Sequence, residues 1–339
     1  MQISTTKHTK GDEVTNPPPT MRIVSMADIR EARSRIAGIT ARTSLIPFQY
    51  DGRTLYLKPE NQQPIGAFKL RGAYNKIASL SDEERSHGVI TYSSGNHAQG
   101  VAYAARALKT KAVIVMPSNA PQVKLEATRA LGAEIVLVGP SGVERQIKAE
   151  ELSAEHGYVI VPPYDDEKII AGQGTAGLEI AEDLPAVDLV LVPIGGGGLI
   201  SGVSTAIKSL KPKARVIGVE PEIAADAQAS LRAGHIVKWP PEKVLSTCAD
   251  GLRAQYVGAL TFEHLRRYVD DVVTVSEDEI IEAVRILADN PQTVAEPSGA
   301  VATAAWISHS DSIPRSNVTV AVISGGNIDP ALLRQVRGS

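Results

Sequence analysis

Residues 189–199 read LVLVPIGGGGL, an apolar run followed directly by four consecutive glycines. The apolar run is typical of a strand covered on both faces, and the periodic apolar residues of 199–210 predict a helix straight after the glycines. Such glycines let backbone N–H groups converge on an anion at the helix N-terminus, where the dipole favours negative charge. Ile200 and Ser201 break the G-x-G-x-x-G spacing, and no P-loop motif occurs. The stretch therefore predicts either a phosphate cradle or a tight turn for close helix–sheet packing.

The same alternation of apolar runs and helical stretches continues on both sides. Strands are expected at 89–92, 112–116, 135–138, 189–192 and 216–219, and helices from Ser25, from Asn96, and at 123–131, 143–156 and 199–210. Strands that alternate with helices of this length indicate an α/β protein with parallel sheets. The first 20 residues are polar and end in Asn16-Pro17-Pro18-Pro19-Thr20, which predicts a flexible extension.

Length and composition limit the function classes. A chain of 339 residues suggests about two domains. Lys plus Arg number 35 against 38 Asp plus Glu, a net charge of −3, which argues against a nucleic-acid partner. Cys248 is the single cysteine, so an intrachain disulfide and a cysteine-based zinc site are excluded. The absence of a membrane-length apolar run or a signal-peptide core leads us to expect a cytoplasmic protein with no membrane partner.

Two further motifs carry chemistry. In the stretch 66–72, GAFKLRG, Lys69 is either a surface lysine or an amine that forms a Schiff base with an aldehyde cofactor. The stretch 93–100, SSGNHAQG, follows an expected strand and opens a helix, which suits a bound carboxylate or an ordinary capping turn. Taken alone, His97 is more readily a structural than a catalytic residue.

Together and in this order, these motifs resemble those of the fold-type II pyridoxal-phosphate (PLP) family of serine/threonine dehydratases and serine racemases. The resemblance extends from about Met21 to Leu333 and is also carried by IAGQGT at 170–175, Asp250-Gly251, AEPSGA at 295–300 and ISGGN at 323–327. It implies an α/β fold like that of the tryptophan synthase β subunit, with two open twisted sheets and the cofactor in the cleft between them. We expect a large domain of residues 21–74 and 167–339, and a small mobile domain of residues 75–166.

The resemblance also implies roles for individual residues. Lys69 would carry the cofactor and then remove the substrate α-proton, Phe68 would line the ring, and Asn96 would bind its 3-oxygen. Ser324 would meet the pyridine nitrogen, where a hydroxyl does not force protonation as a carboxylate would. The phosphate would be held by the backbone amides of Gly195, Gly196, Gly197, Gly198 and Leu199. The substrate carboxylate would bind at Ser93, Ser94, Asn96 and His97.

Three features distinguish members of the family from one another, and a fourth departs from the family's usual pattern. Bacterial threonine dehydratases usually have alanine where this chain has Ser94, whereas serine racemases and hydroxyaspartate dehydratases have a serine that can serve as a second catalytic acid/base beside Lys69; the alternative is support of the carboxylate turn. The divalent-cation loop of racemase-like members is matched by Glu220, the carbonyl of Ala224 and Asp226. These oxygen ligands suit Mg²⁺, or else Ca²⁺ or Mn²⁺. The alternative is that the loop is acidic and solvated and binds no cation. Arg145 either binds a second substrate carboxylate or is a surface residue. Ala67 departs from the serine usual before Phe-Lys.

The resemblance therefore predicts a PLP-dependent ammonia-lyase that acts on L-threonine or L-serine. The enzyme is expected to be a homodimer, and to bind no other partner than its small amino-acid substrate. The alternatives within the family are a 3-hydroxyaspartate dehydratase and a serine racemase. A catalytically idle PLP-binding protein is the alternative from another class.

Overall fold

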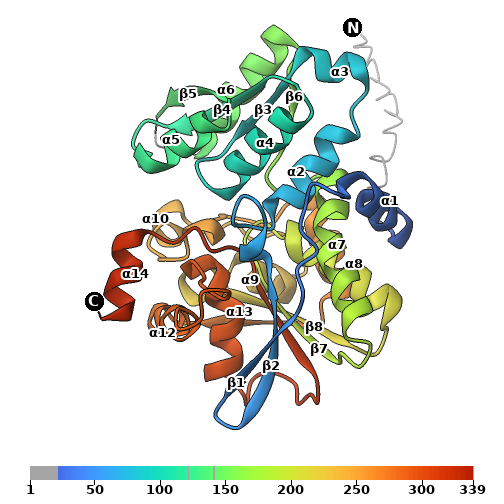
Figure 1. Ribbon diagram of the computed structural model, residues 1–339, viewed down its shortest axis with the longest axis vertical. Coiled ribbons are helices and arrows are strands. Elements are labelled where there is room, and N and C mark those ends of the chain that lie inside the picture. Colours follow the sequence, from blue (N-terminus) through green and yellow to red (C-terminus); the bar gives the residue numbers. More distant parts are fainter. Residues whose placement is uncertain (1–21, 121, 140–141, 339) are drawn as a thin grey trace, which may run out of the picture.

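The computed structural model describes residues 22–120, 122–139 and 142–338, so the flexible extension expected for residues 1–20 lies outside the described residues. Two open sheets, each with helices on both faces, are stacked along the long axis of the molecule (Figure 1). Helix α2 (Lys69–Ala78) runs from the lower, larger unit to the upper, smaller one, so the domain boundary expected at residue 75 falls inside this helix.

The larger sheet has six strands in the order β1-β2-β10-β7-β8-β9. All neighbours are parallel except β1, which pairs antiparallel with β2 at the edge of the sheet. Every residue of β7 and β10 is buried, which explains why the expected strand at 189–192 is an unbroken apolar run. The strands are β1 (Ile46–Tyr50), β2 (Arg53–Pro59), β7 (Leu189–Pro193), β8 (Arg215–Pro221), β9 (Asp271–Val275) and β10 (Thr319–Ile323).

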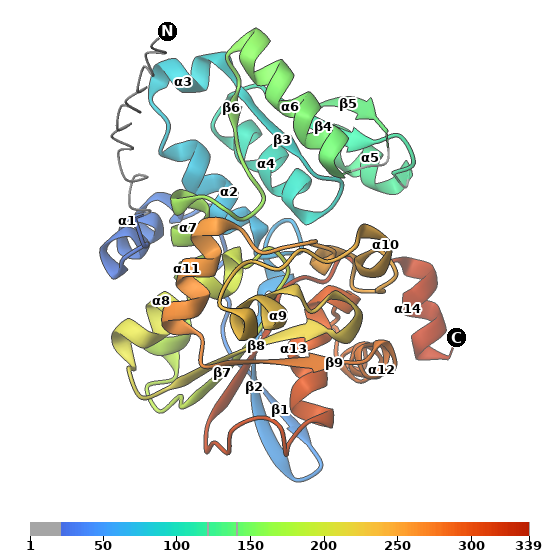
Figure 2. The same ribbon diagram turned by 180° about the vertical axis from the view of Figure 1, so that it is seen from behind.

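Helices cover both faces of this sheet (Figures 1 and 2). Helix α8 packs against β7 and β8 with α7, α1 and α11 outside it, whereas α13 packs against β7 to β10 with α12 and α14 outside it. The first set is α1 (Met26–Ile36), α7 (Glu167–Asp183), α8 (Gly198–Leu210) and α11 (Ala259–Tyr268), and the second is α12 (Glu277–Leu287), α13 (Pro297–Ser308) and α14 (Pro330–Arg337). The shorter helices are α9 (Asp226–Ala233), α10 (Pro241–Val244), η1 (Glu60–Gln62), η2 (Glu222–Ala224) and η3 (Asp250–Leu252).

The smaller sheet is entirely parallel, with strand order β5-β4-β3-β6. Helices α4 and α5 pack on one face of it, and α6 packs on the other. Its elements are α3 (Asp82–His87), β3 (Val89–Tyr92), α4 (Asn96–Ala107), β4 (Ala112–Pro117), α5 (Gln122–Ala130), β5 (Glu134–Val138), α6 (Gly142–His156) and β6 (Val159–Ile160). The strands and helices predicted from the sequence are therefore confirmed to within a residue or two at their ends.

Close helix contacts tie the functional loops together. A Cβ atom on Gly172 of α7 would lie 2.6 Å from the carbonyl oxygen of Arg71 in α2, and one on Gly202 of α8 would lie 2.3 Å from the carbonyl oxygen of Ile170 in α7. The backbones of α2, α7 and α8 can approach this closely only because glycine lacks a side chain at these positions. The start of α2, where Lys69 lies, and the start of α8, where the glycines lie, are thus fixed relative to each other.

None of the helices in the described residues combines the length and apolarity that a membrane span requires.

Candidate active site

Lys69 is the first residue of α2, next to the end of β10. Ala67 pairs with Gly325 in an isolated bridge, and the Phe68 amide donates to the Ser324 carbonyl at 3.1 Å. The Lys69 side chain is half-buried, and its Nζ donates to the Pro163 carbonyl at 2.7 Å. Burial lowers the pKa of this amine to about 8. A substantial fraction of Lys69 is therefore neutral near physiological pH, as a nucleophilic or basic amine must be.

A buried ion network braces the helix that carries Lys69. Arg71 is completely buried and donates to both carboxylate oxygens of Glu60, at 2.7 and 2.8 Å, and to both of Glu179, at 2.7 and 2.9 Å. Lys58 donates to the same Glu179 at 2.5 Å. Two cations and two carboxylates balance here, and removing one member would leave a buried charge uncompensated.

Asn96 begins α4 directly after the Ser93–Gly95 turn at the end of β3. Its Nδ2 donates to Glu296 Oε1 at 2.6 Å, and its Oδ1 accepts from Asn327 Nδ2 at 2.8 Å. A Cβ atom on Gly325 would lie 3.0 Å from Asn96 Nδ2, so the residue after Ser324 touches this amide. Asn96, Lys69 and Ser324 therefore meet around one point, although they are far apart in the sequence.

Ser93 and Ser94 form the turn before α4, and both are half-buried. The Ser93 Oγ accepts from the Gly95 amide at 3.4 Å, which shapes the turn. The side chain of His97, by contrast, is buried, and its Nε2 lies 3.0 Å from the Val161 carbonyl. Burial and the nearby Lys69 charge lower the pKa of this imidazole to about 3, so it is neutral. This arrangement favours the structural reading of the His97 ring over contact with a substrate carboxylate.

The four glycines lie where the sequence predicts, between β7 and α8. Gly197 has a φ of 92°, in the left-handed region that glycine tolerates best. The carbonyl of Gly196 accepts from Thr261 Oγ1 at 2.8 Å and that of Gly197 from the Ser201 amide at 3.0 Å. Within the described residues, the amides of Gly195, Gly196 and Gly197 donate to no protein acceptor. These free donors at a helix N-terminus have the character of an anion site.

Tyr164 connects this loop to Lys69. It follows Pro163, and a Cβ atom on Gly196 would lie 2.2 to 2.3 Å from three atoms of the Tyr164 ring. The next residue, Asp165, accepts from the amides of Ala259, Leu260 and Thr261 and so caps α11. The segment from β6 to α7 thus contacts both the amine and the glycine loop.

Comparison with known proteins shows which protein family has this arrangement of residues. Residues 37–325 match the protein family described as "Pyridoxal-phosphate dependent enzyme". The chain belongs to this family.

Its relatives carry three related activities in their names. The chain is 45% identical to an L-threonine ammonia-lyase of Thermotoga maritima, over 93% of this chain and 78% of the relative. It is 40% identical to an L-threo-3-hydroxyaspartate ammonia-lyase of Saccharomyces cerevisiae, over 91% and 95% of the two chains. The structure of maize serine racemase matches with a TM-score of 0.88 and 39% identity, over 93% and 97%. The family predicted from the motifs, and its α/β fold with two open sheets, are confirmed.

The residues present fit the family's cofactor. The free amides of the glycine loop can receive a phosphate, and the partly neutral Lys69 amine can bind an aldehyde. Ser324 is buried, with its Oγ donating to the Ser298 carbonyl at 3.2 Å, and Phe68 is half-buried beside it. Ala67, which replaces the usual serine, is buried and contributes only its backbone pairing with Gly325.

Glu220, near the end of β8, and Asp226, the first residue of α9, form a buried pair of carboxylates. The carboxylate of Glu220 accepts from the amides of Ala227 and Gln228, both at 2.9 Å, whereas both oxygens of Asp226 are buried without a hydrogen-bond partner. Burial raises the pKa of Asp226 to about 7, and burial together with the Asp226 charge raises that of Glu220. The described residues contain no cluster of three or more His, Cys, Asp or Glu side chains suited to a metal, so a cation here would need carbonyl or water ligands as well.

Two cationic residues lie on the small-domain side. Arg145 is half-buried near the start of α6, and burial lowers its pKa. Lys124 of α5 forms an ion pair of 2.6 Å with Asp250 of η3 and so joins the two units directly. From the sequence alone, no role was predicted for Lys124.

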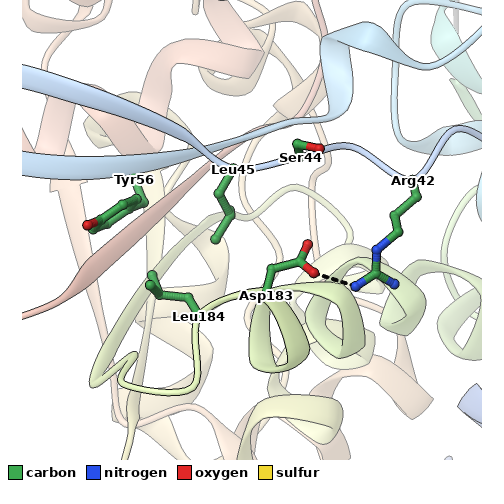
Figure 3. Close-up of a pocket in the computed structure, with 6 residues that line it drawn as sticks. All are labelled: Arg42, Ser44, Leu45, Tyr56, Asp183 and Leu184. Carbon is green, nitrogen blue, oxygen red and sulfur yellow. Dashed lines mark hydrogen bonds and ion pairs between the residues drawn. The ribbon is translucent and has the colours of Figure 1, made fainter.

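A surface hollow of about 300 Å³ lies elsewhere, between β2 and the end of α7 (Figure 3). It is lined by Arg42, Ser44, Leu45, Tyr56, Asp183 and Leu184, with an ion pair between Arg42 and Asp183. None of the predicted site residues lines it.

Sequence reasoning gave no role to Glu296, Pro163 or Tyr164. Glu296 lies in the AEPSGA motif quoted for the family, so its presence was a usable signal. Pro163 acts through its carbonyl oxygen, which no residue pattern reveals.

Proposed function

We propose that this protein is a PLP-dependent ammonia-lyase that converts a β-hydroxy amino acid, L-threonine or L-serine, to a 2-oxo acid and ammonia. The observation that carries the proposal is the half-buried Lys69 amine, which donates to the Pro163 carbonyl, directly follows the residue bonded to Ser324, and has its pKa lowered to about 8. The names of the relatives, an L-threonine ammonia-lyase among them, support the substrate class.

The cofactor would be held by residues from both ends of the chain. The amides of Gly195, Gly196, Gly197, Gly198 and Leu199 would bind its phosphate, Ser324 its ring nitrogen, Asn96 its 3-oxygen and Lys69 its aldehyde carbon, with Phe68 beside the ring. When bound, PLP withdraws electrons from the substrate α-carbon and so makes the α-proton removable.

The chain's own groups then orient the substrate and move its proton. Backbone amides and hydroxyls of the turn from Ser93 to His97, at the start of α4, would bind the substrate carboxylate. The Lys69 amine would take the α-proton, because a pKa near 8 lets it accept a proton near neutral pH and release it again. The β-hydroxyl would leave as water after gaining one proton, which balances the α-proton taken by Lys69. Addition of water to the resulting enamine, through its imine form, would then give the 2-oxo acid and ammonia.

A divalent cation would bind to Glu220, Asp226 and the Ala224 carbonyl. The unpartnered oxygens of Asp226 fit this assignment, since two buried carboxylates are otherwise costly to keep charged. Oxygen ligands of this kind suit Mg²⁺, Ca²⁺ or Mn²⁺.

Serine racemase and 3-hydroxyaspartate dehydratase are the second candidates. Ser94 and the Glu220–Asp226 pair favour them, and so do the names of the maize and yeast relatives. In this reading the Ser94 hydroxyl would exchange a proton on the substrate face opposite Lys69, and Arg145 would bind a second substrate carboxylate.

The small domain of residues 75–166 would close over the substrate, with Lys124 and Asp250 as one contact across the domains. We also propose that the enzyme is a cytoplasmic homodimer.

The test is release of 2-oxo acid from L-threonine, L-serine, D-serine and the 3-hydroxyaspartate stereoisomers, each with Mg²⁺ and with chelator, followed by chiral analysis of the remaining amino acid. Rapid release from L-threonine or L-serine with unchanged chirality would support the ammonia-lyase. Preference for hydroxyaspartate or accumulation of D-serine would support the second candidates.

Two variants accompany this assay. Lys69→Ala should lose both turnover and the absorbance of the lysine-bound cofactor, whereas Lys213→Ala, a change of an exposed lysine, should retain both. Sustained turnover of the Lys69→Ala enzyme would refute the proposal.

A further inference from the structure

A chain of side-chain amides and a carboxylate lies beside Ser324. Asn327 Nδ2 donates to the Ile65 carbonyl at 2.9 Å and to Asn96 Oδ1 at 2.8 Å, and Asn96 Nδ2 donates in turn to Glu296 Oε1 at 2.6 Å. The proposed mechanism uses Asn96 but gives no role to Glu296 or Asn327.

These hydrogen bonds fix which way the Asn96 amide points. Both partners of Asn327 Nδ2 are oxygens, so the Asn96 atom that faces Asn327 is its carbonyl oxygen. The amide nitrogen of Asn96 therefore faces Glu296, and one of its two N–H groups remains after that bond is made. Asn96 can consequently offer this remaining N–H as a donor to a molecule bound beside Ser324.

Glu296 is an unusual residue for this role because it is only 6% exposed. Its Oε1 would lie 2.3 Å from a Cβ atom on Gly325, so this carboxylate lies against the backbone that follows Ser324. Burial, followed by the charge of Asp250, raises the pKa of Glu296 to about 7, while the hydrogen bond from Asn96 and then the charge of Lys124 oppose this rise. Burying a carboxylate costs stability unless hydrogen bonds or opposite charges offset the loss of hydration. The presence of Glu296 at this buried position therefore indicates a role beyond stability.

We propose that Glu296 is a positioning residue that, together with Asn327, orients the Asn96 amide so that its remaining N–H faces the 3-oxygen of the cofactor. This inference rests on the proposed binding of PLP beside Asn96. It does not require Glu296 to touch the cofactor or the substrate.

A double-mutant cycle tests the proposal. The dissociation constant of PLP from the apoenzyme, and the absorption maximum of the bound cofactor, are measured for wild type, Glu296→Ala, Asn96→Ala and the double variant. Loss of a hydrogen bond to a charged group should weaken PLP binding about tenfold in each single variant. Because Glu296 acts through Asn96, the double variant should bind PLP as the Asn96→Ala variant does.

Two further variants separate positioning from folding. Glu296→Gln keeps an oxygen acceptor for Asn96 Nδ2, so its affinity should return to within about threefold of wild type. Thr303→Val removes a buried, unpartnered hydroxyl from the same helix α13 and should leave PLP affinity and absorbance unchanged. If Glu296→Ala does not fold, the cycle is run with Asn327→Ala, which removes the other support of the amide.

Additive losses in the double variant, or unchanged binding and absorbance in Glu296→Ala, would overturn the inference. Unchanged binding in Asn96→Ala would overturn both the placement of PLP beside Asn96 and the inference. Failure of the wild-type chain to bind PLP at all would instead refute the proposed function.

Discussion

The pKa of Lys69 decides whether this amine can act as a nucleophile or a base near neutral pH, and it can be measured directly. Burial without a facing carboxylate lowers the pKa of this amine from 10.5 to about 8. At pH 7.5 an ordinary lysine with a pKa near 10.4 is about 0.1% neutral, whereas an amine with a pKa of about 8 is roughly a quarter neutral. The reactive fraction of Lys69 should therefore exceed that of an exposed lysine by roughly 200-fold.

Reductive methylation of the apoenzyme tests this number over a pH series from 6 to 10.5. Initial labelling of each lysine is followed by peptide mass spectrometry, and the exposed Lys213 in the same digest is the internal control. Labelling of Lys69 should follow the neutral amine, with a midpoint near pH 8, because a lowered pKa releases the proton at lower pH. Lys58, buried and paired with Glu179, should resist labelling.

A labelling rate for Lys69 that keeps rising beyond pH 9.5, in parallel with Lys213, would refute the reasoning. Saturation of the apoenzyme with PLP should protect Lys69 and leave Lys213 unprotected. Equal protection of both residues would point to a general change in accessibility and not to the site.

Three further variants test the second acid/base, the cation site and the contact between the two domains. Ser94→Ala should abolish any racemisation of serine while reducing elimination from an L-substrate far less, and equal losses measured by chiral chromatography would exclude Ser94 as the second acid/base. Asp226→Asn should abolish the stabilisation by Mg²⁺, about 2.7 kcal/mol at a hundredfold excess over Kd, as measured by thermal melting. In chelator, the contribution of Asp226 to stability should fall as pH rises from about 4 to 7, because the folded state holds a proton on Asp226 that the unfolded chain has released. The difference in stability between wild type and Asp226→Asn should therefore change over this range, and a constant difference would contradict the assignment. Lys124→Met should raise KM by less than about fivefold, since its ion pair with Asp250 is partly exposed. It should also weaken the dependence of KM on salt concentration that we expect of the wild type, whereas a fall in kcat alone would argue against a closing contact.

The sequence alone determined the parts of this protein that depend on local pattern. Apolar runs predicted β3, β4, β5, β7 and β8, although β10, which is as buried as β7, was not predicted. Ser25 predicted the start of α1, where the structure has a capping box with Asp28. The glycines after β7 are dictated by local backbone geometry, including the positive φ of Gly197. The order of the motifs was enough to predict the family.

Tertiary structure alone decided the electrostatics. The low pKa of Lys69 depends on burial beside Pro163, which is 94 residues away, and the Asn96 amide is oriented by Glu296, which is 200 residues away. The sequence alone favours a structural role for the His97 ring, and only the folded structure shows its partner, the Val161 carbonyl. Sequence patterns specify which side chains are available, whereas desolvation and hydrogen bonding depend on what the fold packs around them. The fold was therefore predictable from local pattern, while the protonation and orientation of the site residues required the packed structure.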